Sequence, residues 1–227
     1  MTGIVLVGGR SSRLQAQPKP LAMVGNKLIL ARIADALRPV CAELIAVVRP
    51  DQDDPTPDTA LALRMHVVQD VESGVGPLAG LCAGLHAATT PLSFVAGGDH
   101  PFLSGTLISA MAASASVQRG PHGPSAVVPR VDGVFQPLHA VYPTVPWGRV
   151  FCAALSQGER SPLAVVDAAI RAGSPHVEVW DRDRIESHDP GLMSLVDVDT
   201  PAQLARARNL ADWRTNVRPG LRPPRGM

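Results

Sequence analysis

Aromatic residues, cysteines and surplus charge are scarce in this chain of 227 residues. Aromatic side chains make up 4% and hydrophobic residues 45% of the sequence, so a sizeable core is possible and has to be aliphatic. The formal net charge of +1 gives no electrostatic reason to expect nucleic acid or an anionic membrane as a partner. No apolar run reaches membrane-spanning length, and the sequence starts on a core strand. We therefore expect a cytoplasmic protein that contacts neither nucleic acid nor membrane.

Cysteine is represented by three residues, Cys41, Cys82 and Cys152. They are too few and too far apart for a disulfide framework or a Cys-x-x-Cys metal site. Small apolar thiols of this kind are usually buried, and a reducing compartment keeps them free. We expect buried free thiols at all three positions.

The most informative stretch runs from Leu6 to Leu14 (Leu-Val-Gly-Gly-Arg-Ser-Ser-Arg-Leu). Gly8 and Gly9 come at the end of an apolar strand, Gly3 to Val7, and without a Cβ they let the backbone turn sharply and approach a ligand. Successive main-chain N–H groups in such a turn form a concave anion site.

Arg13 and Lys19 bring two positive charges to the same loop, and Lys19 stands between Pro18 and Pro20. A strand, a glycine turn and two cations together describe a cradle for a nucleoside triphosphate. A plain tight turn with solvated charges is the alternative that the residues alone leave open. The P-loop and dinucleotide-binding patterns are both excluded, because no Gly-Lys-Ser/Thr follows and Gly-x-Gly-x-x-Gly is absent.

Two later stretches carry polar residues at strand ends. Asp99 follows an apolar strand, Leu92 to Ala96, and open α/β sheets bind ligands along the carboxyl edge of their strands. A turn or helix N-cap is the alternative role for this carboxylate. Upstream, Pro77 opens a helix in which Gly80 and Gly84 share one face, a spacing that favours close packing on the sheet over contact with a flat ligand.

Strands and helices alternate through the first half of the sequence, which predicts a mostly parallel sheet covered on both faces. A hairpin at Asp132-Gly133 and late strands, one of them at Leu195 to Val198, predict an antiparallel excursion in the second half. We expect a single Rossmann-like three-layer α/β/α domain over residues 1–213. Residues 214–227, rich in Arg, Pro and Gly, are expected to be a disordered tail.

Taken together, five motifs resemble those of the nucleotidyltransferases, and most of all the molybdenum cofactor guanylyltransferases (MobA-type). They are the Leu6–Leu14 loop with Lys19, Gly76-Pro77-Leu78-Ala79-Gly80, Gly98-Asp99-His100-Pro101, Gln136-Pro137-Leu138 and Asp197-Val198-Asp199-Thr200-Pro201. The resemblance covers roughly Thr2 to Ala211. It implies a nucleotidyltransferase fold whose N-terminal half binds the nucleotide and whose C-terminal half binds the acceptor. Enzymes of this family join GMP from GTP to the phosphate of molybdopterin and release pyrophosphate, with Mg²⁺.

The resemblance also implies roles for individual residues. Lys19 corresponds to the catalytic lysine, Asp99 to the metal-binding aspartate, and Arg13 lies near the phosphates. Asp70, with the backbone near Gly80, is expected to read guanine, because one carboxylate can accept the adjacent N1–H and amine donors of that base. An exposed strand-end aspartate is the alternative for Asp70. The implied nucleotide-contacting set is Leu6, Gly8, Gly9, Arg13, Lys19, Asp70, Gly80 and Asp99.

The acceptor side is marked more weakly. His139, Arg160 and Ser161 lie in segments that resemble the acceptor-binding half, where surface or cap roles are the alternative. Asp197 and Asp199 stand where the family more often has asparagine, and either is a candidate to aid the metal or the acceptor. Cofactor-synthesis or molybdoenzyme delivery proteins are the expected partners.

The sequence departs from the family at three places, with Leu14-Gln15 in place of Met-Gly and Pro18 in place of Asp. The Pro-Lys-Pro string resembles sugar-phosphate and molybdopterin-cytidylyl relatives, whereas Gly8-Gly9 and the Gly76–Gly80 motif resemble the guanylyl branch. We therefore expect GTP as the substrate. The alternatives are a cytidylyl or other nucleotidyltransferase for a different phosphorylated acceptor, and a non-catalytic nucleotide-binding assembly factor, against which the intact Lys19 and Asp99 argue.

Overall fold

The computed structural model describes residues 1–9, 18–70, 76–117 and 123–216 of the chain. The strands are β1 (Thr2–Leu6), β2 (Met23–Val24), β3 (Lys27–Leu28), β4 (Glu43–Val48), β5 (His66–Gln69), β6 (Leu92–Gly97), β7 (Ala126–Val131), β8 (Val134–Phe135), β9 (His139–Pro143) and β10 (Val177–Trp180). The α-helices are α1 (Ile29–Leu37), α2 (Thr56–Ala62), α3 (Pro77–Ala87), α4 (Gly105–Ser116), α5 (Thr144–Ser156), α6 (Pro162–Ala172), α7 (Arg182–Glu186) and α8 (Pro201–Asn216).

The main sheet has the strand order β10-β7-β9-β6-β1-β4-β5, with β8 paired to β7. β1 lies between two parallel neighbours, β4 and β6, and β5 extends the parallel part beyond β4. β9 is antiparallel to both β6 and β7, while β10 is again parallel to β7. The mostly parallel sheet with an antiparallel excursion in the second half is therefore confirmed.

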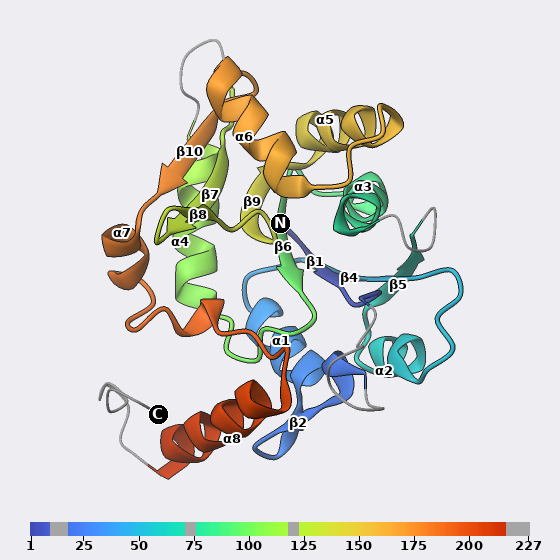
Figure 1. Ribbon diagram of the computed structural model, residues 1–227, viewed down its shortest axis with the longest axis vertical. Helices are drawn as coiled ribbons and strands as arrows, with labels where there is room; N and C mark the ends of the chain where they lie inside the picture. The colour runs from blue at the N-terminus through green and yellow to red at the C-terminus, as the bar shows by residue number, and fades with distance from the viewer. Residues whose placement is uncertain (10–17, 71–75, 118–122, 217–227) are drawn as a thin grey trace.

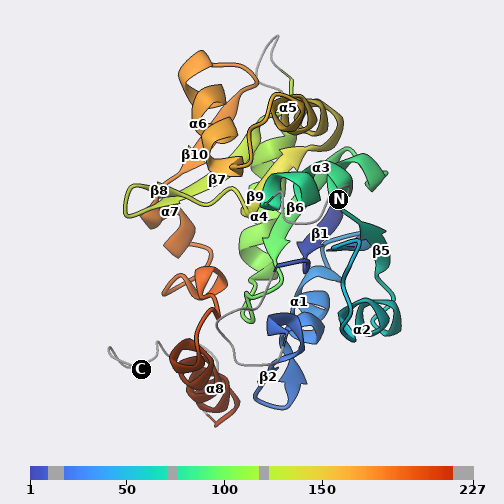
Figure 2. The same cartoon turned by 45° about the vertical axis from the view of Figure 1, so that its right-hand side comes forward.

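Helices cover both faces of the sheet, as Figures 1 and 2 show. One apolar cluster packs α1, α2, α4 and α8 with one side of the strands; the other packs α3, α5 and α6 against the opposite side. The second cluster contains a rare aromatic group, Tyr142, Trp147 and Phe151, whose rings lie 5.0–5.2 Å apart. The first cluster contains Phe94, Phe102 and Trp180, and the remaining core residues are mainly aliphatic. The α/β/α three-layer architecture predicted from the alternation of elements is present.

Several segment boundaries differ from those expected. Leu195 to Val198 is not a strand: a 3₁₀ turn occupies Met193–Leu195, and the backbone N–H of Val198 donates to the carbonyl of Asp99 at 3.0 Å. The five-residue helix α7 and the small β2–β3 hairpin were not predicted, because both are too short for a periodic pattern to show. Helix α8 ends at Asn216, beyond the expected end at Trp213, so the expected tail begins no earlier than residue 217, outside the described residues.

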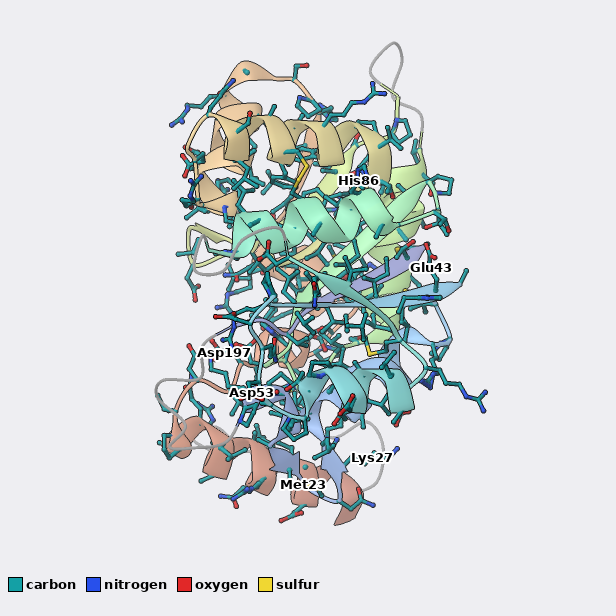
Figure 3. All side chains as sticks on the ribbon, turned by 90° about the vertical axis from the view of Figure 1, so that its right-hand side faces the viewer. Met23, Lys27, Glu43, Asp53, His86 and Asp197 are labelled. Carbon is teal, nitrogen blue, oxygen red and sulfur yellow. A yellow bond between two sulfur atoms is a disulfide. The ribbon has the colours of Figure 1, made fainter. Side chains whose placement is uncertain are left out.

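The cysteines also differ from the expectation. Cys82 on α3 and Cys152 on α5 form a disulfide, with Cα atoms 5.3 Å apart. Figure 3 shows this yellow bond between the two helices. The expectation of three free thiols is therefore wrong for this pair, because 70 residues of sequence separation hide the fact that α3 and α5 pack side by side. Cys41 is free, and burial raises the pKa of its thiol to about 11.

Candidate active site

A cavity of about 640 Å³ lies where four neighbouring strands, β1, β4, β5 and β6, reach their carboxyl ends. Six of the residues predicted to contact a nucleotide line it: Leu6, Gly8, Gly9, Asp70, Gly80 and Asp99. Figure 3 shows Asp197, another lining residue, on the opposite side of the molecule from Glu43, which begins β4. The structure thus gathers the predicted residues on one edge of the sheet, as expected for an open α/β sheet. Arg13 lies outside the described residues.

Lys19 reaches this edge from a 3₁₀ turn, Lys19–Leu21, that Pro18 precedes. Its ammonium nitrogen lies 3.4 Å from Oδ2 of Asp99 and donates a hydrogen bond to Oδ1 of Asp199. Burial alone lowers the pKa of the Lys19 amine, but the hydrogen bonds and charges of Asp199 and Asp99 outweigh burial and raise it. Lys19 is therefore held as a cation beside Asp99, which lines the cavity.

The carboxylate of Asp99 is held from two sides. Oδ1 lies 3.0 Å from Nδ1 of His100, and Oδ2 faces the ammonium of Lys19. Burial alone raises the pKa of Asp99, but the adjacent imidazole of His100 and the ammonium of Lys19 lower it below its ordinary value. Asp99 is thus an ionised carboxylate just past the end of β6. Such a carboxylate is a suitable oxygen ligand for a cation.

Glycine is required where the ends of β1, β4 and β6 approach one another. A Cβ on Gly98 would lie 2.8 Å from Cγ1 of Val7, and the Gly98 N–H donates to the carbonyl of Leu6 at 2.9 Å. A Cβ on Gly8 would lie 3.1 Å from the backbone nitrogen of Arg49. Nothing lies within 4 Å of a Cβ on Gly9, whose backbone therefore faces open space at the cavity.

The other wall of the cavity is formed by the start of α3. Gly76 has φ +96° and ψ 178°, a conformation that only glycine adopts readily, and it turns the chain into Pro77. A Cβ on Gly80 would lie 3.7 Å from Oδ2 of Asp70, so the carboxylate faces this turn of the helix. By contrast, a Cβ on Gly84 would lie 2.6 Å from Cγ2 of Ile4. The favoured packing role is therefore confirmed for Gly84, while Gly80 lines the cavity.

The second half of the chain supplies the remaining wall. Gln136, Pro137 and Leu138 lie between β8 and β9 and line the cavity. Ser161 lines it as well and caps α6 by accepting the N–H of Ala164. Asp197 also lines this wall. Burial, followed by the charge of Asp199, raises the pKa of its carboxyl.

Two acceptor-side candidates do not line this cavity. His139 is 1% exposed, its Nε2 lies 3.1 Å from Oγ of Ser194, and burial lowers the pKa of its imidazole well below the usual value. It therefore packs inside the protein. The side chain of Arg160 donates to the carbonyl of Leu155 and is exposed, and its own carbonyl lies 3.3 Å from a Cβ on Gly76. The backbone of Arg160 therefore lies close to that of Gly76 at the start of α3.

Sequence reasoning assigned no individual role to Arg49 or His100, although both line the cavity. His100 stands beside the predicted Asp99, and Arg49 follows the last residue of β4. The signal for Arg49 was present, because a charged residue just past a buried strand lies at the same edge as Asp99. Among the described residues, no group of three or more His, Cys, Asp or Glu side chains is arranged to hold a metal, and no helix is long and apolar enough to cross a membrane.

A profile of the MobA-like NTP transferase domain matches residues 3–173. The chain belongs to this family. A relative from Natronomonas pharaonis, named "Probable molybdenum cofactor guanylyltransferase", is 31% identical over 210 residues, which are 91% of this chain and 96% of the relative. The resemblance carried by the five motifs is therefore confirmed, and with it the nucleotidyltransferase class of this family member.

Solved structures share the fold of this protein. The molybdopterin-guanine dinucleotide biosynthesis protein A of Archaeoglobus fulgidus superposes with a TM-score of 0.71 at 24% identity, covering 93% of this chain and 99% of that one. The 2-C-methyl-D-erythritol 4-phosphate cytidylyltransferase of Thermus thermophilus gives a TM-score of 0.63 at 19% identity, with coverages of 92% and 98%. A protein named for guanine dinucleotide biosynthesis and a cytidylyltransferase thus share this fold. The fold alone therefore does not identify which nucleotide base is bound.

Proposed function

We propose that this protein transfers GMP from GTP to the phosphate of molybdopterin, forming the guanine dinucleotide cofactor and releasing pyrophosphate. The observation that carries the proposal is the cavity shared by Gly8, Gly9, Asp70 and Asp99, with the ammonium of Lys19 3.4 Å from Asp99. The membership in the MobA-like family and the name of the Natronomonas relative support the same reaction.

In this reaction an oxygen of the acceptor's phosphate attacks the α-phosphorus of GTP, and the bond to pyrophosphate breaks in line. Negative charge develops on the α-phosphoryl oxygens and on the leaving group. Lys19 is held protonated beside the cavity, so its ammonium stabilises that charge, with Arg13 near the phosphates. Leu6, Gly8 and Gly9 hold the nucleotide through backbone groups. No covalent enzyme intermediate is needed, because the acceptor itself is the nucleophile.

Asp99 is the proposed protein ligand for Mg²⁺. Mg²⁺ is commonly held by one or two carboxylates together with substrate phosphate oxygens, so a site without three protein ligands among the described residues fits it. When bound, Mg²⁺ neutralises charge on the phosphates. Asp99 is ionised and anchored by His100, and Asp199 lies close enough to share the ammonium of Lys19 with it. Asp197 and Asp199 are the further carboxylates that aid the metal or the acceptor.

The acceptor is placed against the second half of the cavity, between Gln136–Leu138, the cap of α6 and Asp197. The Pro18-Lys19-Pro20 string favours a second candidate, transfer of CMP to molybdopterin or to another phosphorylated acceptor. A cytoplasmic location and partner proteins that synthesise or receive the cofactor remain predictions.

The test is pyrophosphate release by the whole protein with Mg²⁺ and molybdopterin, comparing GTP with CTP and molybdopterin with sugar 1-phosphates. Release that requires both GTP and molybdopterin is the expected result. Release with CTP keeps the reaction class and overturns the base assignment. Release with a sugar phosphate overturns the acceptor, and binding of GTP without turnover of any acceptor supports a non-catalytic assembly factor instead.

A further inference from the structure

Arg49 occupies a place in the cavity that the proposed reaction has not used. It follows Val48, the last residue of β4, and its side chain is 19% exposed. Among the described residues that line the cavity, it is the one with a permanently cationic side chain. Its Nε lies 3.3 Å from Oδ1 of Asp51.

Arg49 and Asp70 are neighbours across two parallel strands. β4 and β5 pair in the register Val48 with Gln69, and the N–H of Asp70 donates to the carbonyl of Val48 at 2.8 Å. The next residues in that register are Arg49 and Asp70, and side chains at the same register position lie on the same face of a sheet. A guanidinium donor and a carboxylate acceptor therefore stand side by side along one wall of the cavity.

The stem of Arg49 also supports the first glycine turn. A Cβ on Gly8 would lie 3.0 Å from Cγ of Arg49 and 3.1 Å from its backbone nitrogen. The turn therefore lies directly on this side chain. Arg49 is thereby placed between the loop that holds the nucleotide and Asp70, whose Oδ2 faces the Gly80 turn of α3.

Guanine presents two kinds of group in sequence along its edge: the amine and N1–H donors, then the O6 and N7 acceptors. Asp70 is the proposed partner of the donors. The side chain next to Asp70 along the wall, Arg49, is then the one available to bind the O6 and N7 acceptors. A guanidinium donates to this pair of acceptors with two parallel N–H groups. We propose that Arg49 is a specificity-determining residue for the base, binding O6 and N7 of guanine. This inference rests on GTP being the nucleotide of the proposed function.

The proposed contact excludes other bases by their chemistry. Adenine places an amine donor where guanine has O6, so it would oppose the donors of Arg49. Cytosine lacks an N7 atom, so the two parallel hydrogen bonds of the guanidinium cannot both form. Arg49 would thus add discrimination that Asp70 alone does not supply, because Asp70 reads only the donor side of the base.

The experiment measures dissociation constants by calorimetry for the whole protein with Mg²⁺ and three nucleotides: GTP, 7-deaza-GTP, which lacks N7, and inosine triphosphate, which lacks the amine. Wild type is expected to bind 7-deaza-GTP several-fold to about tenfold more weakly than GTP, the range for loss of part of a bidentate contact. Arg49→Gln is expected to bind GTP about tenfold more weakly and to bind GTP and 7-deaza-GTP equally. It should still bind inosine triphosphate more weakly than GTP, whereas Asp70→Asn should lose that second preference.

Two further variants keep the test decisive. Arg49→Met keeps much of the stem that packs on Gly8 but has no hydrogen-bond donor, so it should also lose the preference for N7. Arg171→Gln removes an arginine from the last turn of α6, where its side chain is 72% exposed, and should bind all three nucleotides like wild type. Thermal unfolding of each variant shows whether the fold is intact.

Three results would overturn the inference. Wild type that binds GTP and 7-deaza-GTP equally has no N7 contact. An Arg49→Gln protein that binds GTP, 7-deaza-GTP and inosine triphosphate more weakly by one common factor places the guanidinium on the phosphates or ribose. An Arg49→Met protein that keeps the full N7 preference shows that the side chain of Arg49 is not the partner of N7. Failure of wild type to bind GTP at all is a different outcome, because it overturns the proposed function itself.

Discussion

Lys19 and Asp199, 180 residues apart in the sequence, are joined by a hydrogen bond from the ammonium to the carboxylate. Asp199 reaches this position because the segment before α8 is tied to the end of β6, where the N–H of Val198 donates to the carbonyl of Asp99. The last segment of the fold therefore completes a charge cluster that begins in the first loop. In this structure Asp199 and Asp99 together hold the ammonium of Lys19, the cation that the proposed reaction needs.

Replacing Lys19 by Ala should lower kcat by about 10²–10³-fold, the usual cost of removing one donor from a site where charge develops. The binding of GTP should change less, because the backbone and base contacts remain. Lys27 is the matched control, since it is exposed and pairs with Asp35 away from the cavity. Steady-state kinetics on Lys19→Ala and Lys27→Ala check this; equal losses in both variants would remove the catalytic role of Lys19.

Substitution by alanine should affect stability at one glycine of α3 and GTP binding at another. Gly84→Ala places a Cβ 2.6 Å from Ile4, so unfolding free energy should fall by about 1–3 kcal/mol. Gly80→Ala meets only ordinary contacts at 3.4–3.7 Å, and alanine is the better helix former, so stability should hold while the KM for GTP rises. Urea unfolding and kinetics on both variants check the pair. A Gly80 variant with unchanged KM would mean that the base does not lie against this turn.

The Cys82–Cys152 disulfide should contribute to stability. A cross-link that closes a loop of this length removes roughly 4 kcal/mol of unfolded-chain entropy in the simplest model. The Tm in a non-reducing buffer should therefore drop on addition of dithiothreitol, and Cys82→Ser should start from the lower value and not respond. Cys41→Ser is the control and should respond like wild type. Titration of the denatured, unreduced protein should find the single free thiol of Cys41; three thiols would contradict the bond.

Asp197→Asn should stabilise the protein at neutral pH. Burial, with the charges of Asp199 and Asp99, raises the pKa of Asp197 above the ordinary 3.8, so its ionised form costs stability at every pH above the raised pKa. Asparagine removes that cost and retains the oxygen that accepts from Gln203 at 2.8 Å. The gain, about 1–3 °C in Tm, should shrink as the pH falls towards 3.8.

The control for this pH dependence is Asp167→Asn, which removes an exposed carboxylate paired with Arg171 on α6. It should give no gain at neutral pH. Thermal unfolding of both variants between pH 4 and 8 makes the comparison. A gain for Asp197→Asn that grows on acidification would show that its ionised form is stabilised in the fold.

The sequence predicted most of the parallel half of the fold, because alternation of apolar strands with helical periods is a local pattern. The edge position of Asp99 and of Asp70 followed from the same pattern, since each stands just past the end of a parallel strand, β6 and β5 respectively. Long-range pairings were not predictable in this way. The partnership of Cys82 with Cys152 depends on how α3 packs on α5, which no local period reports.

The segment before α8 shows a second limit. Leu195 to Val198 is apolar enough for a strand, yet Val198 bonds to the end of β6 and the segment forms no ladder. Tertiary context decided its conformation, and with it the approach of Asp199 to Lys19. Arg49, which follows the last residue of β4, lies at the same edge of the sheet as Asp70 and Asp99, so the strand-end pattern that predicts those carboxylates applies to this cation as well.

The central claim is transfer of GMP from GTP to molybdopterin, and the fate of two radioactive phosphorus labels tests it most directly. With Mg²⁺ and molybdopterin, label from the α-phosphate of GTP should appear in a product containing guanine and the pterin, and label from the γ-phosphate should appear only in pyrophosphate. Lys19→Ala should form neither at a comparable rate. Label from the γ-position in the pterin product, or α-label that stays in free GMP or GTP while the protein binds both substrates, would contradict the account.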